Sequence, residues 1–439
     1  MLEKLRNIFQ VPELKRRIIF TLAVFFVYRI GEHVPTPGVN AKALAGAFEG
    51  QSGTLFGIYD LFVGGAFSRA TIFALGIMPY ISSSIILQLL GAVVPHFEKL
   101  RKEGEEGQKK LTQYTRYGTV FISIIQSLAY SVFLVNLGAS KGLSVVPQPG
   151  LLFALSTVIT QTTGTILVMW MGEKITEHGI GNGISLIIFL NILGRGPNAL
   201  FAAYDSFRGG TLSILAIAFA LALMVFVIAA VIAMTQATRK VPVQYAKRIV
   251  GRRMYGGANT HIPLRVNSAG VIPIIFGQSV MILPATVAGF VPPNHPLAQV
   301  GMWFSRTTFV YNLIYGVIIV FFTYFYTAVV LNPNDLAENM RKYGGFIPGI
   351  RPGRRTAEYI DRVLSRITIP GAIFVALMAV LPDLLLAESG MPFLAFGGTS
   401  VLIVVGVALD TLQQIESHLL MRHYEGFVKR GRIRGRQRM

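Results

Sequence analysis

The sequence contains no cysteine and unusually little charge. Without Cys among its 439 residues, the chain cannot form disulfides, thiol nucleophiles or cysteine-ligated metal sites. Charged residues make up only 14% of the chain and hydrophobic residues 52%, whereas a soluble domain typically carries about 25% charged residues. Too few polar side chains remain to cover the surface of a soluble protein. These absences predict an integral membrane protein.

Motifs of enzymes and of ion-coupled transporters are also missing. The sequence has no Walker-type loop and no Gly-x-Ser-x-Gly elbow, and its seven histidines show no zinc-binding spacing. The apolar centres of its long hydrophobic segments hold almost no ionisable residue, although ion-coupled transporters usually need carboxylates or histidines there. We therefore expect no enzyme, cofactor or metal, but a passive conduit. An inverted-repeat secondary transporter and a scaffold without a pore are the alternatives.

The chain contains many long apolar segments. A helix needs about 20 apolar residues to cross roughly 30 Å of hydrocarbon. Ten segments meet this need, and they lie near residues 18–35, 70–94, 117–138, 151–172, 182–200, 211–234, 270–291, 308–331, 367–387 and 392–411. The fifth is the weakest, because its continuous apolar part is short. The pattern predicts an all-α protein with ten transmembrane helices.

Basic residues mark the orientation. Most of the 40 Lys and Arg fall in alternate loops and in both termini, which places these segments and both chain ends in the cytoplasm. The two longest cytoplasmic loops, at about 235–269 and 331–366, are rich in Arg, Gly and Pro. They predict a docking platform for a large acidic partner, although fixing the topology and touching anionic lipids would be a simpler role. Residues 412–439 form a basic cytoplasmic tail.

A short motif recurs after five spans. The second span contains Gly-Ile-Met-Pro at 76–79, and the seventh opens with Gly-Val-Ile-Pro at 270–273. An odd offset reverses the direction of the chain, so the halves 1–200 and 201–411 would be inverted repeats. Helix breakers at matching places indicate bent helices beside a central pore.

Several stretches carry a resemblance to a known family. They span the chain and lie at 28–31, 35–38, 69–81, 113–118, 179–183, 267–273, 349–353 and 396–400. Together they resemble the SecY family of protein-export channels from the first span to the last. The resemblance implies an hourglass pore that passes unfolded secretory polypeptides across the bacterial cytoplasmic membrane and releases hydrophobic segments sideways into the bilayer. It also implies the small subunits SecE and SecG, and either the ATPase SecA or a ribosome with its nascent chain, as partners.

The resemblance further implies roles for particular residues. A constricting ring would be formed by six isoleucines: Ile81, Ile85, Ile184, Ile188, Ile275 and Ile403. A plug at about 55–67 would include Gly57, Tyr59, Asp60, Gly64 and Gly65. Gln126 and Asn267 would form the lateral gate. Docking would involve five arginines: Arg252, Arg253, Arg351, Arg354 and Arg355.

Each assignment has a plainer alternative. An isoleucine in a membrane helix is usually core filler or faces lipid. The segment 55–67 is too short to span and would otherwise be an interfacial helix. Gln126 would be satisfied within its own half, and Asn267 would cap its helix.

Overall fold

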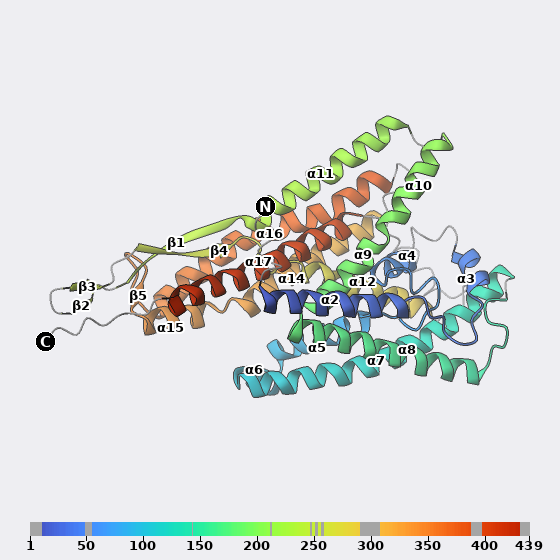
Figure 1. Cartoon of the computed structure of the whole chain (residues 1–439), viewed down its shortest axis with the longest axis horizontal. Coiled ribbons are helices and arrows are strands. Elements are labelled where there is room, and N and C mark those ends of the chain that lie inside the picture. The colour runs from blue at the N-terminus through green and yellow to red at the C-terminus, as the bar shows by residue number, and fades with distance from the viewer. Residues whose placement is uncertain are drawn as a thin grey trace.

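The computed structural model is an elongated bundle whose helices follow one long axis (Figure 1). It describes residues 11–48, 55–142, 144–210, 213–245, 248–250, 253–255, 259–289, 308–387 and 397–430. Every predicted span contains a described helix. In chain order these are α2 (Pro12–Gly31), α5 (Met78–Val93), α7 (Glu105–Lys141), α8 (Leu151–His178), α9 (Gly183–Gly194) with α10 (Gly196–Arg208), α11 (Ile214–Gln236), α12 (Ile272–Gly289), α14 (Phe309–Val330), α16 (Arg354–Ala387) and α17 (Gly398–Arg430).

Length and composition qualify most of these helices as membrane spans. Within the described residues, seven helical stretches are long and apolar enough to cross a membrane, or eight if α5 and the short α6 (Pro95–Lys102) form one bent span. The helix α2 falls outside this group because its first turns carry Glu13 and a run of basic residues. The bundle is therefore all-helical, and the chain is a multi-span membrane protein.

The second span differs from the prediction. Residues 70–77 are not helical, and α5 begins only at Met78, with Pro79 in its first turn. This irregular backbone is paired within the protein: the Ile72 N–H donates to the Val34 carbonyl at 2.9 Å, and the Thr36 N–H donates to the Ala70 carbonyl at 2.8 Å. Irregular backbone is tolerated at membrane depth only where protein satisfies it in this way. At its other end, α5 turns by 97° into α6.

The two Gly-x-x-Pro motifs have the same local structure. Gly76 and Gly270 both have positive φ, +53° and +62°, and each lies two residues before the start of its helix, α5 or α12. Positive φ favours glycine because it has no Cβ. The motifs therefore start helices and do not bend them, which corrects the expected bend. Their match supports the two inverted halves, which remain a prediction.

The described parts of the two long loops at 235–269 and 331–366 fold together into a small sheet, which the all-α prediction did not include. The strands β1 (Thr238–Tyr245) and β4 (Asn259–Arg265) form an antiparallel hairpin, and β1 also pairs with β5 (Gly345–Phe346). The short strands β2 (Arg248–Val250) and β3 (Arg253–Tyr255) pair further along the hairpin. Helix α15 (Pro333–Lys342) and the start of α16 complete this unit around buried apolar side chains such as Val243, Met340 and Ile360. Loops 235–269 and 331–366 therefore form one platform.

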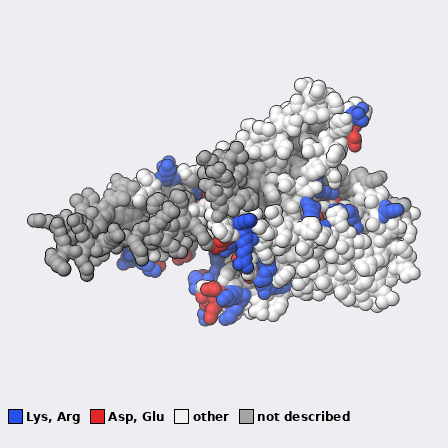
Figure 2. Space-filling model, viewed as in Figure 1, with Lys and Arg blue, Asp and Glu red and all other residues white. Residues whose placement is uncertain are grey.

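The ends and sides of the bundle differ in composition. The sheet and α15 lie at one end of the long axis, and the short helix α3 (Ala41–Phe48) lies near the other end (Figure 1). On the visible face, Lys, Arg, Asp and Glu gather toward the ends of helices and leave broad uncharged areas between them (Figure 2). Large apolar side chains are exposed along the sides, including Leu215, Phe219 and Phe226 of α11. Such a surface suits hydrocarbon rather than water.

Candidate pore, plug and lateral seam

The six isoleucines assigned to the ring lie in one apolar cluster. They come from α5, α9, α12 and α17. Five of them expose no more than 5% of their surface, and Ile184 is partly buried against the same cluster. The structure therefore brings together residues that are more than 300 positions apart, between Ile81 and Ile403.

A tight turn fixes the position of α9, which carries two of these isoleucines. Asn182 caps the helix: its side-chain oxygen accepts hydrogen bonds from the backbone N–H groups of Ile184 and Ser185, at 3.1 and 3.2 Å. The Gly181 N–H donates to Gln414 of α17 at 2.9 Å. The Gly-Ile-Gly-Asn-Gly motif at 179–183 thus connects the start of α9, which carries Ile188, to α17, which carries Ile403.

The plug segment, residues 55–67, lies inside the bundle. It consists of α4 (Leu55–Phe62), which contains Gly57, followed by turns in which Gly64 and Gly65 adopt positive φ. Tyr59 and Asp60 are buried, with 6% and 3% exposure. The Tyr59 hydroxyl donates to the Leu75 carbonyl at 2.9 Å. This segment is therefore packed as core and is not a surface loop helix.

Side chains from two long helices hold the plug segment. The Tyr130 hydroxyl of α7 donates to the Phe67 carbonyl at 2.7 Å. The Asn191 amide of α9 donates to the Phe62 carbonyl at 2.8 Å and to the Tyr28 hydroxyl at 2.9 Å. Sequence reasoning missed Tyr130 and Asn191, although a polar amide within an apolar helix is itself a signal of function.

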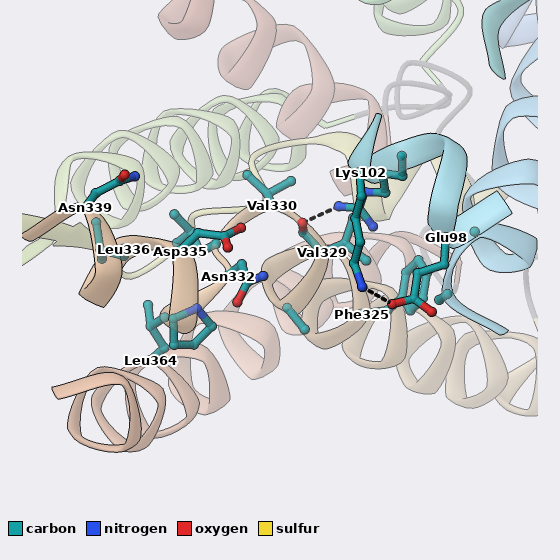
Figure 3. Close-up of a pocket in the computed structure, with 16 residues that line it drawn as sticks. Glu98, Lys102, Phe325, Val329, Val330, Asn332, Asp335, Leu336, Asn339 and Leu364 are labelled. Atoms are coloured by element: carbon teal, nitrogen blue, oxygen red, sulfur yellow. Dashed lines mark hydrogen bonds and ion pairs between the residues drawn. The ribbon is translucent and has the colours of Figure 1, made fainter. Parts of the chain in front are cut away.

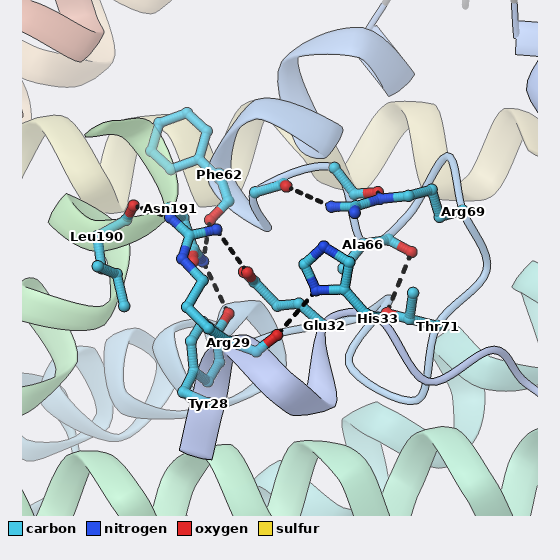
Figure 4. Close-up of polar contacts among 12 residues, drawn as sticks. Tyr28, Arg29, Glu32, His33, Phe62, Ala66, Arg69, Thr71, Leu190 and Asn191 are labelled. Atoms are coloured by element: carbon cyan, nitrogen blue, oxygen red, sulfur yellow. Dashed lines mark hydrogen bonds and ion pairs between the residues drawn. The ribbon is translucent and has the colours of Figure 1, made fainter. Parts of the chain in front are cut away.

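Charged residues complete this network (Figure 4). Arg195, in the break between α9 and α10, donates to Asp60 Oδ2 at 2.7 Å. Arg29 pairs with the fully buried Glu32 at 2.6 Å and donates to the Leu190 carbonyl at 2.7 Å. Arg69 donates to the carbonyls of the plug glycines, Gly64 and Gly65, at 3.0 and 2.9 Å. Arginine side chains therefore contact the plug segment and the end of α9.

The lateral seam, the junction of α5 and α7 with α12, is closed. Helix α12 contacts both α5 and α7, and it also contacts α4. Gln126 of α7 is buried, and its Oε1 has no hydrogen-bond partner. The Asn267 amide donates to the Gly270 carbonyl at 3.2 Å, just before α12. No hydrogen bond joins these two amides within the described residues, so neither bridges the seam in this conformation.

A cleft opens where α6 approaches the end of α14 (Figure 3). It has a volume of about 910 Å³ and lies between α5 and α6 on one side and α14, α15 and α16 on the other. Arg101 of α6 spans it and donates to the Val329 carbonyl near the end of α14. Beside it, Lys102 donates to Glu98 at 2.6 Å, which holds the pKa of that carboxyl below its usual value.

The arginines expected to dock a partner belong to the two loops that contribute to the small sheet. Arg351 is exposed in the turn between β5 and α16, and its carbonyl accepts a hydrogen bond from the buried Thr356 at 3.0 Å. Arg354 pairs with Glu358 at 3.1 Å, and Arg355 is exposed. Arg253 lies in β3, whereas Arg252 is outside the described residues. The pairing of β1 with β5 brings the two arginine-bearing loops into one unit.

Comparison with known proteins identifies the family. The family model described as SecY matches residues 71–412. The "Protein translocase subunit SecY" of Aquifex aeolicus is 43% identical over 431 residues, which cover 98% of this chain and 100% of that protein. The chain belongs to the SecY family. Membership makes it a channel subunit rather than an enzyme, and it sets aside the transporter and scaffold alternatives.

Solved structures agree with the SecY fold. One, described as "The structure of a protein conducting channel", superposes with a TM-score of 0.65 at 17% identity and covers 92% of both chains. Another, "Sec61 in the Canine ribosome-channel complex from the endoplasmic reticulum", gives a TM-score of 0.60 at 16% identity, again over 92% of both chains. At these identities the likeness establishes the fold of the bundle.

Proposed function

We propose that this chain conducts unfolded secretory polypeptides across the bacterial cytoplasmic membrane, with both termini in the cytoplasm, and releases hydrophobic segments sideways into the bilayer. Family membership supports the activity. The observation that carries the mechanism is that all six isoleucines, contributed by four helices, belong to or pack against the main apolar core of the bundle. The closed contact of α12 with α5 and α7 supports a seam that parts to reach lipid.

An aliphatic constriction suits a pore that must pass every side chain. Charged or amide groups in a narrow throat would bind parts of the passing polypeptide and would keep the constriction wet. Isoleucine offers no such partner, and a narrow apolar neck favours dewetting, which blocks ions. Its stiff χ1 keeps the radius of the neck defined.

Single-channel conductance during translocation tests the ring. Exchanging several of the six isoleucines for serine should let ions leak, most of all while a polypeptide is in transit, whereas exchange for leucine or valine should be mild. Exposed isoleucines such as Ile86 and Ile373 provide matched controls, because they lie outside the cluster. A tight seal in the multiple serine variant would place the constriction on other residues.

The cytoplasmic platform is proposed to bind the driving partner. SecA or a translating ribosome would supply the energy, SecE and SecG would complete the membrane complex, and anionic lipids would contact the basic loops. Ribosome binding is supported by the ribosome-bound structure that shares the fold. Arg351 is exposed between Pro348 and Pro352, which stiffen its turn and present the guanidinium to carboxylate or phosphate.

Charge reversal at Arg351 tests this docking role. Arg351→Glu should insert normally, because the loop keeps other basic residues, but should lose translocation driven by purified SecA. Arg362→Glu is the matched control, since Arg362 is also exposed but lies within α16 and outside the turn. Equal transport by both variants would exclude Arg351 from the docking site.

A further inference from the structure

The plug segment carries a single charged side chain, and that charge is buried. Asp60 is the only Asp, Glu, Lys, Arg or His between residues 55 and 67, and its side chain exposes 5% of its surface. A buried carboxylate is costly in a membrane protein unless it is paired. Both of its oxygens are used: Oδ1 accepts the Ser68 N–H at 2.8 Å, and Oδ2 accepts Arg195 at 2.7 Å.

The two partners of Asp60 differ in how far they lie from it in the sequence. Ser68 follows the plug segment in sequence, so its hydrogen bond shapes the local turn and would travel with the segment. Arg195 is 135 residues away, in the break between α9 and α10. The Asp60–Arg195 pair therefore connects the one charge of the plug segment to a fixed part of the bundle.

The break between α9 and α10 holds Arg195 in place. Its backbone N–H caps α9 by bonding to the Ile192 carbonyl at 3.2 Å. The neighbouring Gly194 lies against Arg29: a Cβ at residue 194 would come within 1.7 Å of the Arg29 guanidinium. Arg29 in turn donates to the Leu190 carbonyl. The guanidinium that meets Asp60 thus projects from a closely packed helix end.

We propose that Arg195 is the positioning residue that keeps the plug segment seated, and that its ion pair with Asp60 must break before the segment can leave. This inference rests on the proposed function of residues 55–67 as a plug. While the segment is seated, removing one partner of this pair would leave the other charge unpaired, so loss of either partner should destabilise the seated state. Arg195 is itself 32% exposed, and Asp60 would regain water outside the bundle, so release is reversible.

The absence of cysteine allows a direct test of plug position. Val63→Cys introduces a single thiol at a fully buried site in the plug segment with little change in volume. In full-length protein in native membranes, labelling by a membrane-impermeant maleimide measures how often this site becomes accessible. In this background Asp60→Asn and Arg195→Gln should each increase the labelling rate at least about tenfold, the effect of losing a charged hydrogen bond.

Three further variants separate the ion pair from other effects. Arg195→Lys keeps the charge and should stay within about threefold of the parent. The exchange Asp60→Arg with Arg195→Asp should reverse most of the increase, which a folding defect would not do. Arg208→Gln is the matched control, because Arg208 contacts Tyr204 at the far end of α10, and it should label like the parent.

Two outcomes would overturn the inference in distinguishable ways. If an arrested secretory polypeptide exposes the thiol in the parent but Arg195→Gln labels no faster than Arg208→Gln, the plug moves and Arg195 does not hold it. If the thiol stays protected even with a polypeptide arrested in the pore, residues 55–67 are not a plug, and that part of the proposed function fails first.

Discussion

The proposed plug segment and the proposed lateral seam are held in place by different kinds of contact. The plug segment is held by directional bonds from Tyr130, Asn191 and Arg195, each to one defined atom. At the seam, α12 packs against α5 and α7, and the two amides assigned there do not meet each other. Directional bonds fail when one atom is lost, whereas apolar contact declines gradually with area. The plug should therefore be sensitive to single substitutions and the seam tolerant of them.

The largest effect is expected from removing the plug segment. Deleting residues 57–65 removes Asp60 together with the three plug glycines, Gly57, Gly64 and Gly65, and it should leave a folded channel because the long helices keep their mutual contacts. The open probability in planar bilayers should rise many-fold. A deletion variant as tight as the parent would show that the seal lies elsewhere, in the isoleucine cluster.

The second largest effect is expected from replacing one amide side chain, that of Asn191. Asn191→Leu leaves the buried Phe62 carbonyl and the Tyr28 hydroxyl without their donor, and we expect a loss of about 2–4 kcal/mol in unfolding free energy. Unfolding by denaturing detergent, followed by helical circular dichroism, measures this loss. Gln88→Leu on α5 is the control, because Gln88 is partly exposed and bonds only to Ser84 among its described contacts. Equal stability of the two variants would contradict the bonding seen here.

At the seam the expected effect is smaller and differs between the two amides. Gln126→Leu removes a buried oxygen that has no partner, so it should favour the closed seam by about 1–2 kcal/mol and raise the hydrophobicity that a signal sequence needs. Asn267→Leu should raise this threshold less, because it removes an unpartnered buried oxygen, Oδ1, but also removes the hydrogen bond from its amide to the Gly270 carbonyl. A series of signal sequences of graded hydrophobicity gives the threshold. The opposite ranking would assign the gate to Asn267.

The smallest effect is expected at the contact between α6 and the end of α14. Arg101 is exposed and donates to a carbonyl near the end of α14, an interaction of a cation with a helix terminus worth about 0.3–1 kcal/mol. Arg101→Gln should lower the signal-sequence threshold slightly, and Lys99→Gln on the same helix should not. A large effect of Arg101→Gln would mean that this one bond dominates the seam.

Much of the architecture was accessible from sequence, for physical reasons. A membrane span must be continuously apolar over about 20 residues, so every predicted span contains a helix. Residues 70–77 were wrongly predicted to be part of a transmembrane helix, because an apolar segment buried in protein has the same composition as one that crosses lipid. The pairing of β1 with β5 was also invisible, since two residue pairs link loops about 100 positions apart.

The plug network shows where sequence reasoning stops. The family resemblance located Asp60 but not Arg195, since charges 135 residues apart leave no periodic pattern. The side chain of Glu32, near the end of the first span, is fully buried, and sequence reasoning assigned no role to it or to Asn191. Their partners are set by how the helices pack, which composition does not encode.

The bonds of the plug segment have a consequence for the order of events during transport. The bonds from Tyr130, Asn191 and Arg195 all join it to the amino-terminal half of the chain, whereas it meets the other half through contact with α12. If α12 swings away to open the seam, the plug segment should stay behind with its hydrogen-bonded partners. A hydrophobic segment could then slip into the bilayer while the membrane stays electrically sealed. Simultaneous recording of membrane insertion and conductance would reveal this: insertion without current supports separate barriers, and a current with every insertion event shows that they open as one.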